Sequence, residues 1–288
     1  MFGPEGPLVG ILTEANPEYA SADLPSVVFL NSGIVHRVGA NRMYVRIARR
    51  LAERGFTTLR FDHAGIGDSG PRRDDRPFNE SAVEEARAAM ELLARVRGSS
   101  RFILGGLCSG ADVAFWTALG DDRVVGLFQM DPFVYRTPRF LLSYYLPRLL
   151  SPAAWWRSLS SRGRHLAGRL RSGAGGPPQD TGWAAPEYTR IFPPRSEVAG
   201  GLRTLADRGV SFYVFVSGTM FEYVSYADQY ERSFPEVDFG GRLVVDFAPE
   251  ADHTVTDPGH QERVIQGIEG WATERWPSSN DAPGGSGS

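Results

Sequence analysis

The single cysteine of the chain, Cys108, lies in the stretch GLCSG at residues 106–110, after an apolar run and before a helix-like segment. The spacing is G-x-nucleophile-x-G, in which the nucleophile occupies a tight strand-to-helix turn and needs small residues two positions away on either side. Centring the pattern on Ser109 would put Leu107 at a position that needs a small residue. The thiol of Cys108 is therefore the predicted nucleophile, and the start of a helix favours its thiolate form.

A nucleophilic thiol works with a base that accepts its proton. His253 lies in VVDFAPEADHTVTD, between the last predicted strand and the last predicted helix. A loop at that point ends at the same edge of a parallel sheet as Cys108. His253 is thus the predicted general base, ahead of the other four histidines.

The elements that would position these residues are short apolar runs alternating with helical patterns. Near-continuous apolar runs are typical of strands covered on both faces. The alternation predicts an α/β fold, with a mostly parallel central sheet and helices on both faces. The predicted strands are residues 8–12, 26–30, 56–62, 101–106, 123–130, 211–217 and 242–248, and the predicted helices that flank them are residues 40–55, 79–98 and 256–276.

Two of these helices carry recognisable start signals. Ser81 and Glu84 form a capping-box pattern at the start of the second helix. Thr256 and Asp257, followed by Pro258, are typical of the cap and first turn of the last helix.

One long segment, residues 132–200, interrupts the alternation with aromatic residues and prolines but no clear strand. Insertions of this length in a compact domain are usually lids or binding loops. We expect a helical cap here, set into a core formed by residues 1–131 and 201–276. Residues 277–288 are rich in Gly and Ser and are predicted to be a disordered tail.

The predicted cap carries far more basic than acidic residues. Such a surface is either a solvated helical face or a face that attracts an anionic partner. Its acidic residues are Asp180, Glu187 and Glu197, and its arginines are Arg136, Arg139, Arg148, Arg157, Arg162, Arg164, Arg169, Arg171, Arg190 and Arg195.

Composition excludes several classes of function. The net charge is only −3, which argues against general binding of nucleic acids. No apolar run approaches the roughly 18 to 20 residues that span a bilayer, and no secretion signal is visible. One cysteine cannot form an internal disulfide, so a reducing cytoplasm is the expected location. Nothing in the sequence calls for a metal or a cofactor.

Together the motifs resemble the α/β-hydrolase superfamily. FLNSG at 29–33 stands where that superfamily has its oxyanion loop, with Asn-Ser in place of His-Gly, and RFDHAGIGDSG at 60–70 is similar to an architectural turn of the same fold. GLCSG matches the nucleophile elbow, and EADHT at 250–254 is like the histidine loop. Residues 31–62 look particularly like the serine-aminopeptidase-like and exosortase-associated branches.

The resemblance implies further site residues. The oxyanion would be held by backbone amides of Ser109 and of Gly33 or Ile34. The usual chain order places an acid after the strand at 211–217. There Glu222 is favoured, Asp228 follows it, and Asp131 after the preceding strand is an alternative position that the superfamily also uses.

Several residues are candidates for binding substrate. His36, Arg37 and Arg42 would hold a carboxylate or phosphate, although Arg42 pairing with Asp62 as a structural bridge is an equal expectation. The fold commonly places a cap over the nucleophile, so aromatic residues of the insertion would line an acyl pocket. The residues predicted for that pocket include Tyr135, Trp155 and Trp156.

Three functions remain open from the sequence. The first is a cysteine-dependent acyl-transfer enzyme, a thioesterase or acyltransferase, whose substrate is a small acyl ester or thioester carried on coenzyme A or on an acidic acyl or peptidyl carrier protein. The acyl-cysteine would be a thioester, which exchanges readily with thiols and amines. The second is a simple ester, lactone or peptide hydrolase. The third, a non-catalytic member of the fold that binds a ligand, is disfavoured by the intact set of triad candidates.

Overall fold

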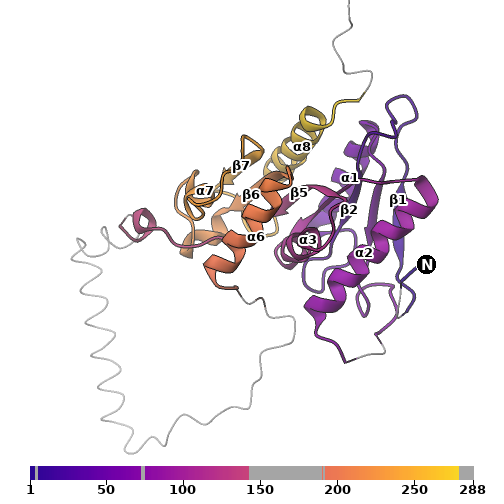
Figure 1. Ribbon diagram of the computed structural model, residues 1–288, viewed down its shortest axis with the longest axis horizontal. Helices are drawn as coiled ribbons and strands as arrows, with labels where there is room; N and C mark the ends of the chain where they lie inside the picture. The colour runs from indigo at the N-terminus through magenta and orange to yellow at the C-terminus, as the bar shows by residue number, and fades with distance from the viewer. Residues whose placement is uncertain (4–5, 73–74, 143–189, 191, 279–288) are drawn as a thin grey trace, which may run out of the picture.

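The computed structural model describes residues 1–3, 6–72, 75–142, 190 and 192–278, without the side chains of residues 221 and 222. Its centre is a seven-stranded sheet in the order β1-β3-β2-β4-β5-β6-β7 (Figure 1). Strand β1 is antiparallel to β3, and every other neighbouring pair is parallel. The strands are β1 (Gly10–Thr13), β2 (Ser26–Phe29), β3 (Thr58–Phe61), β4 (Phe102–Leu107), β5 (Val124–Met130), β6 (Ser211–Ser217) and β7 (Leu243–Ala248).

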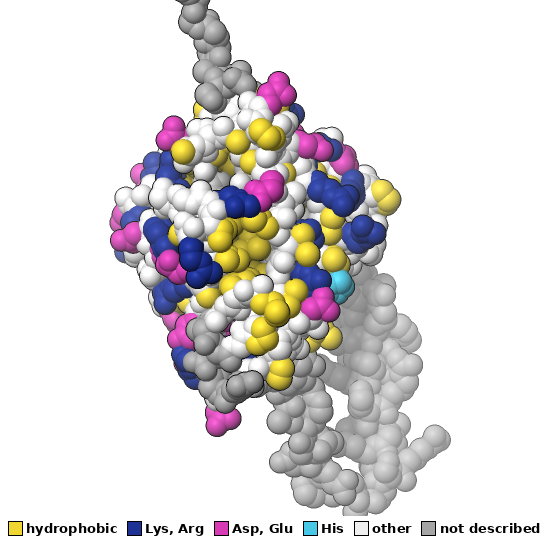
Figure 2. All heavy atoms as spheres, turned by 90° about the vertical axis from the view of Figure 1, so that its right-hand side faces the viewer, with side chains coloured by type: hydrophobic (Ala, Val, Ile, Leu, Met, Phe, Trp, Pro, Cys, Tyr) yellow, Lys and Arg dark blue, Asp and Glu magenta, His cyan; other side chains and the backbone are white. Residues whose placement is uncertain are grey.

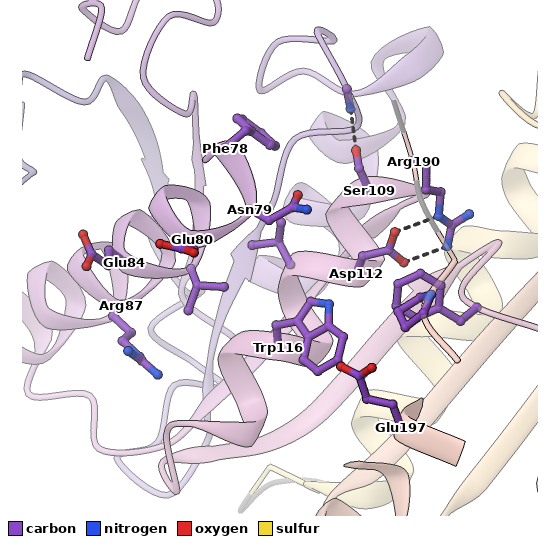
Figure 3. A pocket seen from close by; sticks show the side chains of 15 residues that line it. Phe78, Asn79, Glu80, Glu84, Arg87, Ser109, Asp112, Trp116, Arg190 and Glu197 are labelled. Carbon is purple, nitrogen blue, oxygen red and sulfur yellow. Dashed lines mark hydrogen bonds and ion pairs between the residues drawn. The ribbon is translucent and has the colours of Figure 1, made fainter. Parts of the chain in front are cut away.

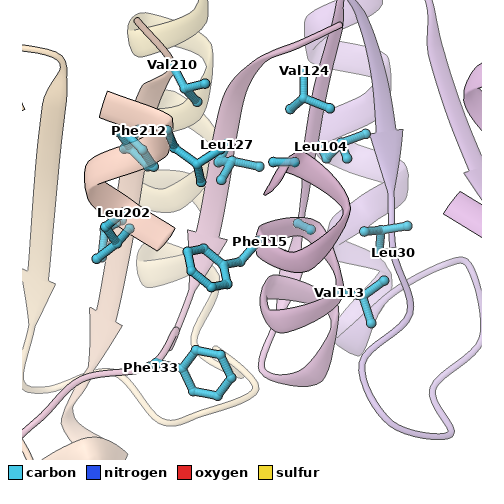
Figure 4. Packing of buried hydrophobic residues seen from close by; sticks show 14 of the residues in the cluster. Leu30, Leu104, Val113, Phe115, Val124, Leu127, Phe133, Leu202, Val210 and Phe212 are labelled. Carbon is cyan, nitrogen blue, oxygen red and sulfur yellow. The ribbon is translucent and has the colours of Figure 1, made fainter. Parts of the chain in front are cut away.

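Helices cover both faces of this sheet and bury two apolar clusters. On one face, α2 (Phe78–Arg97), α3 (Ser109–Leu119) and α6 (Arg195–Asp207) pack over the strands. Figure 4 shows part of this cluster, with Phe115 of α3 between Leu202 of α6 and the strands. On the other face, α1 (Met43–Glu53) and α8 (Pro258–Arg275) pack side by side. The predicted α/β-hydrolase architecture is the one observed.

The predicted strands all occur within two residues of their expected bounds, because buried parallel strands leave long apolar runs in the sequence. The cap of α8 is also confirmed, since Asp257 accepts hydrogen bonds from the amides of Gly259 and His260. The prediction of a capping box at the start of α2 is wrong. This helix begins at Phe78 after Pro77, so Ser81 lies inside it and donates its hydroxyl to the carbonyl of Phe78.

The predicted insertion ends earlier than expected. Helix α6 begins at Arg195 and buries Val198 and Ala199 in the core, so residues 195–200 belong to the layer that covers the sheet. Three short helical turns complete the description: η1 (Ala40–Arg42), η2 (Gly218–Glu222) and α7 (Gln229–Arg232). Most of the predicted cap, residues 143–189 and 191, lies outside the described residues, as does the tail from residue 279.

The surface in Figure 2 carries charged side chains of both signs around a central hollow where hydrophobic side chains gather. This mixture agrees with the small net charge of −3. Within the described ranges, no helix combines the length and the apolar character needed to cross a membrane.

Candidate active site

Cys108 lies between the end of β4 and the start of α3, in a backbone conformation that is rare for a residue with a side chain. Its φ is 56° and its ψ is −119°. A Cβ atom on Gly110 would lie 2.5 Å from the carbonyl oxygen of Leu30, and one on Gly106 would lie 2.7 Å from the same oxygen. Both glycines are therefore required by the close approach of Leu30, the residue that follows β2, and this gives the G-x-C-x-G spacing its physical reason.

The buried hydroxyl of Tyr44, on α1, holds this turn in place. It donates to the carbonyl of Leu30, 3.1 Å away, and accepts from the amide of Leu107, 2.7 Å away. The amide of Cys108 in turn donates to the carbonyl of Met130 on β5 at 2.8 Å. The backbone on both sides of the thiol is thus tied to β2, β5 and α1.

His253 lies in the loop between β7 and α8 and reaches Cys108, as the sequence predicts. Its imidazole lies close enough to the thiol for each group to shift the pKa of the other. The Nδ1 atom lies 2.6 Å from Oδ2 of Asp131, which leaves Nε2 for the sulfur. The carboxylate of Asp131 is fully buried, whereas the imidazole is one-third exposed at 33%.

Asp131, at the end of β5, is the acid that the structure brings to His253. Its Oδ1 accepts from the amide of Ser217 and its Oδ2 from the hydroxyl of Ser217, each at 2.7 Å. Glu222, the acid favoured by the sequence, ends η2, and its side chain lies outside the described residues. Asp228 lies at the surface, bound to Arg232 and 3.6 Å from Arg139.

Arg190 approaches the thiol from the returning end of the long insertion. Its guanidinium forms two hydrogen bonds of 2.7 Å with the carboxylate of Asp112 on α3. One of its nitrogens lies 3.8 Å from Sγ of Cys108 and 2.9 Å from the carbonyl oxygen of Asp131. The side chain also packs over the rings of Phe133 and Phe192, so it is held in a fixed place beside the sulfur.

These neighbours set the protonation of the site. Burial opposes ionisation of Cys108, but the hydrogen bond from His253 and the charges of Arg190 and His253 outweigh it, so the pKa of the thiol lies below its usual value. Hydrogen bonds to Asp131 and Cys108 raise the pKa of His253 to about 10. Burial raises the pKa of Asp112 to about 6, although Arg190 acts in the opposite direction. Both shifts favour the pair of thiolate and imidazolium over the pair of neutral groups.

One of the amides predicted to hold an oxyanion is already used by a protein atom. The amide of Gly33 donates to the hydroxyl of Ser109 at 2.7 Å, an interaction drawn in Figure 3. Ser109 is the first residue of α3, and its own amide has no acceptor among the described residues. The side chain of Ile34 is 73% exposed and points away from the core.

A cleft of about 560 Å³ opens beside Ser109 and Gly33. Figure 3 shows it between α2 and α3, with Trp116 on its wall. Its apolar walls also include Phe78 and Phe133. Acidic side chains lie on the same walls, namely Glu80, Glu84, Asp112 and Glu197, together with the basic side chains Arg87 and Arg190.

The residues predicted to bind an anion are either paired with carboxylates or exposed. Arg37 forms ion pairs with Asp62 and Asp68, so it provides the structural bridge that was considered for Arg42. His36 and Arg42 are exposed, and Arg42 precedes α1 with a φ of 61°.

The predicted acyl pocket also differs from the observed cleft. Tyr135 donates its hydroxyl to the carbonyl of Pro193 at 2.6 Å and is not among the residues that line the cleft. Trp155 and Trp156 lie outside the described residues. Trp116 lines the cleft and lies in α3. The helical pattern of the sequence predicts the helix, but it does not distinguish a residue that lines a cleft from one that lies in the core.

Three further residues belong to the site although no sequence pattern predicted them there: Arg190, Asp112 and Ser217. Asp112 is four residues after Cys108, so one turn of α3 places it next to the thiol, and this spacing was an available signal. The described residues include no group of three or more His, Cys, Asp or Glu side chains arranged to hold a metal ion.

Residues 25–174 match the family model of the serine aminopeptidases, S33, and this range is more than half of the 288 residues. The chain belongs to the serine aminopeptidase S33 family. The match begins just before β2 and includes the elbow at Cys108. A search of curated proteins finds no relative that matches the chain.

Solved structures share the fold of this S33 family member at low sequence identity. XC6422 from Xanthomonas campestris, described as an α/β serine hydrolase without lid, is 16% identical with a TM-score of 0.54, over 97% of this chain and 95% of that one. A thermophilic esterase from Thermogutta terrifontis is 18% identical with a TM-score of 0.52, over 93% of each chain. Est1E from Butyrivibrio proteoclasticus, solved with ferulic acid, is 16% identical with a TM-score of 0.54, over 95% and 98%.

Proposed function

We propose that this chain is a cysteine-dependent acyl-transfer enzyme, a thioesterase or acyltransferase, that works through an acyl-Cys108 intermediate. One observation carries the proposal: buried Asp131 bonds His253, and the imidazole of His253 lies close enough to a thiol held on a strained turn to lower the pKa of that thiol. Strain and a lowered thiol pKa at the same residue are features of reactive rather than structural cysteines.

In the acylation step, the Cys108 thiolate attacks the carbonyl carbon of an ester or thioester. The new S–C bond forms while the carbonyl electron pair moves to oxygen, and the resulting oxyanion is held by hydrogen-bond donors. When this intermediate collapses, the imidazolium of His253 gives its proton to the departing alcohol or thiol. Asp131 keeps the imidazole in the tautomer and orientation that both transfers need.

The second step returns the enzyme to its first state. Neutral His253 takes a proton from the acceptor, which attacks the acyl-Cys108 thioester and displaces the thiolate. A thioester reacts readily with thiols and amines, so a cysteine in this position favours transfer to such acceptors over transfer to water. The substrate is a small acyl ester or thioester, whose apolar part fits the aromatic walls of the cleft.

The hypothesis that an acidic carrier protein delivers the acyl group depends on the arginines of the predicted cap. Four of its ten arginines are described, and all four are engaged: Arg190 with Asp112, Arg195 with Glu236, and Arg136 and Arg139 over aromatic rings. The remaining six lie outside the described residues. If they receive a carrier, raising the salt concentration will raise KM for a carrier-bound substrate and leave a small neutral thioester unaffected.

Simple hydrolysis of an ester is the second candidate function. It is favoured by the fold shared with a protein described as a thermophilic esterase, and the same triad would serve it with water as the acceptor. The two functions differ only in the acceptor that resolves acyl-Cys108.

The test is to acylate the enzyme with a small thioester and detect the adduct by intact mass and peptide mapping. The adduct is then chased separately with water, thiols and amines. We expect modification at Cys108 and faster loss with a thiol or amine than with water. Faster loss with water would favour the hydrolase, and no adduct on Cys108 would overturn the nucleophile assignment. Cys108→Ala is the matched control, because it keeps every other residue of the site.

A further inference from the structure

The side chain of Ser109 occupies the place where the oxyanion donors meet. Its hydroxyl oxygen lies 2.7 Å from the amide nitrogen of Gly33 and accepts that hydrogen. Both residues line the cleft, and Figure 3 shows the side chain of Ser109 there, on the residue that follows Cys108 in the sequence. The Gly33 amide, which resemblance assigns to the oxyanion, is therefore already used by a protein atom.

A serine hydroxyl has one hydrogen to donate and two lone pairs to accept with. At Ser109 one lone pair takes the Gly33 amide hydrogen, so the hydroxyl hydrogen must point elsewhere. No acceptor for it exists in the described part of the chain, nor for the Ser109 amide hydrogen. Ser109, which lines the cleft and is next in sequence to the nucleophile, thus has two hydrogens without an acceptor among the described residues.

The first turn of α3 explains why these hydrogens remain free. The amides of Ala111 and Asp112 both donate to the carbonyl of Cys108, at 2.9 and 3.2 Å. The amide of Ser109 comes before this turn closes and has no carbonyl to reach. The positive end of the helix therefore presents unsatisfied donors at the position where negative charge develops during attack by Cys108.

We propose that the Ser109 hydroxyl is itself an oxyanion donor, and that the Gly33 amide acts through it rather than on the substrate. Hydrogen bonds in series polarise one another, so the Gly33 amide makes the Ser109 O–H a stronger donor. The oxyanion then receives the amide and the hydroxyl of the same residue. This role rests on the proposed function, because it requires Cys108 to attack a carbonyl.

The experiment compares Ser109→Ala, Ser109→Thr and the unaltered enzyme with p-nitrophenyl butyrate as the acyl donor. Removing the hydroxyl should lower kcat for acylation by about 10²-fold, as loss of one oxyanion donor does, with KM changed less than about twofold. Ser109→Thr keeps a hydroxyl on the same carbon and should recover most of this loss. Ser99→Ala is the matched control, because it removes a hydroxyl bonded to Ser26 at 2.6 Å near the opposite edge of the sheet.

The opposite result has a clear meaning. If the Gly33 amide is the true donor and the hydroxyl only occupies it, Ser109→Ala will free that amide and leave kcat unchanged or higher, which overturns the proposal. If the hydroxyl merely anchors the loop at Gly33, the variant will lose thermal stability or raise KM without a selective fall in kcat, which also overturns it.

A trifluoromethyl ketone separates failure of this role from failure of the proposed function. Its carbonyl adds the Cys108 thiolate reversibly to give a stable oxyanion, whose ionisation is followed by ¹⁹F NMR. An adduct that forms in both proteins, with a higher oxyanion pKa in Ser109→Ala, supports the hydroxyl as a donor. Equal pKa values in both would remove Ser109 from this role while leaving Cys108 as the nucleophile. No adduct in either would instead count against the nucleophile itself.

Discussion

Nδ1 of His253 lies 2.6 Å from Oδ2 of Asp131, although 122 residues separate the two along the chain. Asp131→Asn would replace this acceptor with an amide of the same shape, so the imidazole would lose its tautomer and its charge stabilisation. We expect kcat/KM to fall by about 10²- to 10⁴-fold, the range seen when a triad acid is neutralised. Asp228→Asn, on an exposed acid, is the control and should retain activity.

The alternative acid is tested in the same series. Glu222→Gln should leave kcat/KM within about twofold of the unaltered enzyme, the scatter of a change outside a triad. If Glu222→Gln loses activity while Asp131→Asn stays active, Glu222 is the acid of the triad, as the sequence favours.

Cys108 and His253 should behave as one unit. Cys108→Ala and His253→Ala are each expected to lower kcat by at least about 10³-fold, and the double variant should be little worse than either, because each change disables the same step. The measurement is a double-mutant cycle on one small ester. Losses that multiply in the double variant would assign the two residues separate roles.

The protonation of the pair predicts a broad activity profile with pH. The pKa of Cys108 is lowered, so the rate of its alkylation by iodoacetamide should already be high at neutral pH. The pKa of His253 is about 10, so kcat/KM should fall as pH rises through that value. The stabilisation that His253 gains from Asp131 is present below its unfolded pKa of about 6.5 and is likewise lost through pH 10. A thiol that alkylates only above its ordinary pKa would contradict the ion pair.

Arg190 should tune the thiol without being required for the fold. Arg190→Met removes the positive charge 3.8 Å from the sulfur, and we expect the alkylation pKa of Cys108 to rise. Combining it with Asp112→Asn avoids leaving a buried carboxylate without a partner. Arg195→Met, which removes a surface ion pair to Glu236, is the control. Because the charge of Asp112 acts on the thiol in the opposite direction, the double variant is compared with Asp112→Asn alone, and equal pKa values of Cys108 in these two proteins would confine Arg190 to a structural role.

Gly110 should be intolerant of a side chain. Alanine there would place Cβ 2.5 Å from the carbonyl oxygen of Leu30 and 2.8 Å from that of Asn31, both rigid backbone atoms. We expect the free energy of unfolding to fall by about 1–3 kcal/mol, as for other overpacked sites. Gly200→Ala, inside α6 with open space around it, should instead raise it by about 0.5–1 kcal/mol. Urea denaturation of the two variants makes the comparison.

The fold could be predicted because its signals are local. Each buried parallel strand is an apolar run, and the elbow glycines mark the turn between β4 and α3. The start of α2 was missed because the cap residue is Pro77, which offers no side-chain hydrogen bond, while a capping-box pattern stands one turn further along.

The positions of Asp131 and Arg190 in the site depend on contacts between segments that are far apart in the sequence. Asp131 reaches His253 because β5 and β6 lie in register, with Met130 opposite Phe215 and the amide of Asp131 donating to the carbonyl of Phe215. No local pattern separates Asp131 from Glu222. Arg190 is one of ten arginines in the predicted cap, and nothing in the sequence distinguishes it from the others as the one that lies beside the thiol.

The two hydrogen bonds of Tyr44 have a consequence for how this enzyme would adapt to different substrates. One hydroxyl bonds both Leu30, just after β2, and Leu107, at the end of β4. The sulfur of Cys108 therefore cannot shift relative to the sheet unless α1, which carries Tyr44, moves with it. The attacking atom is thus a fixed reference point. Differences in acyl length or branching must be met by the surroundings, through the side chains that α2 and α3 turn toward the cleft, and changes of preference should arise there first.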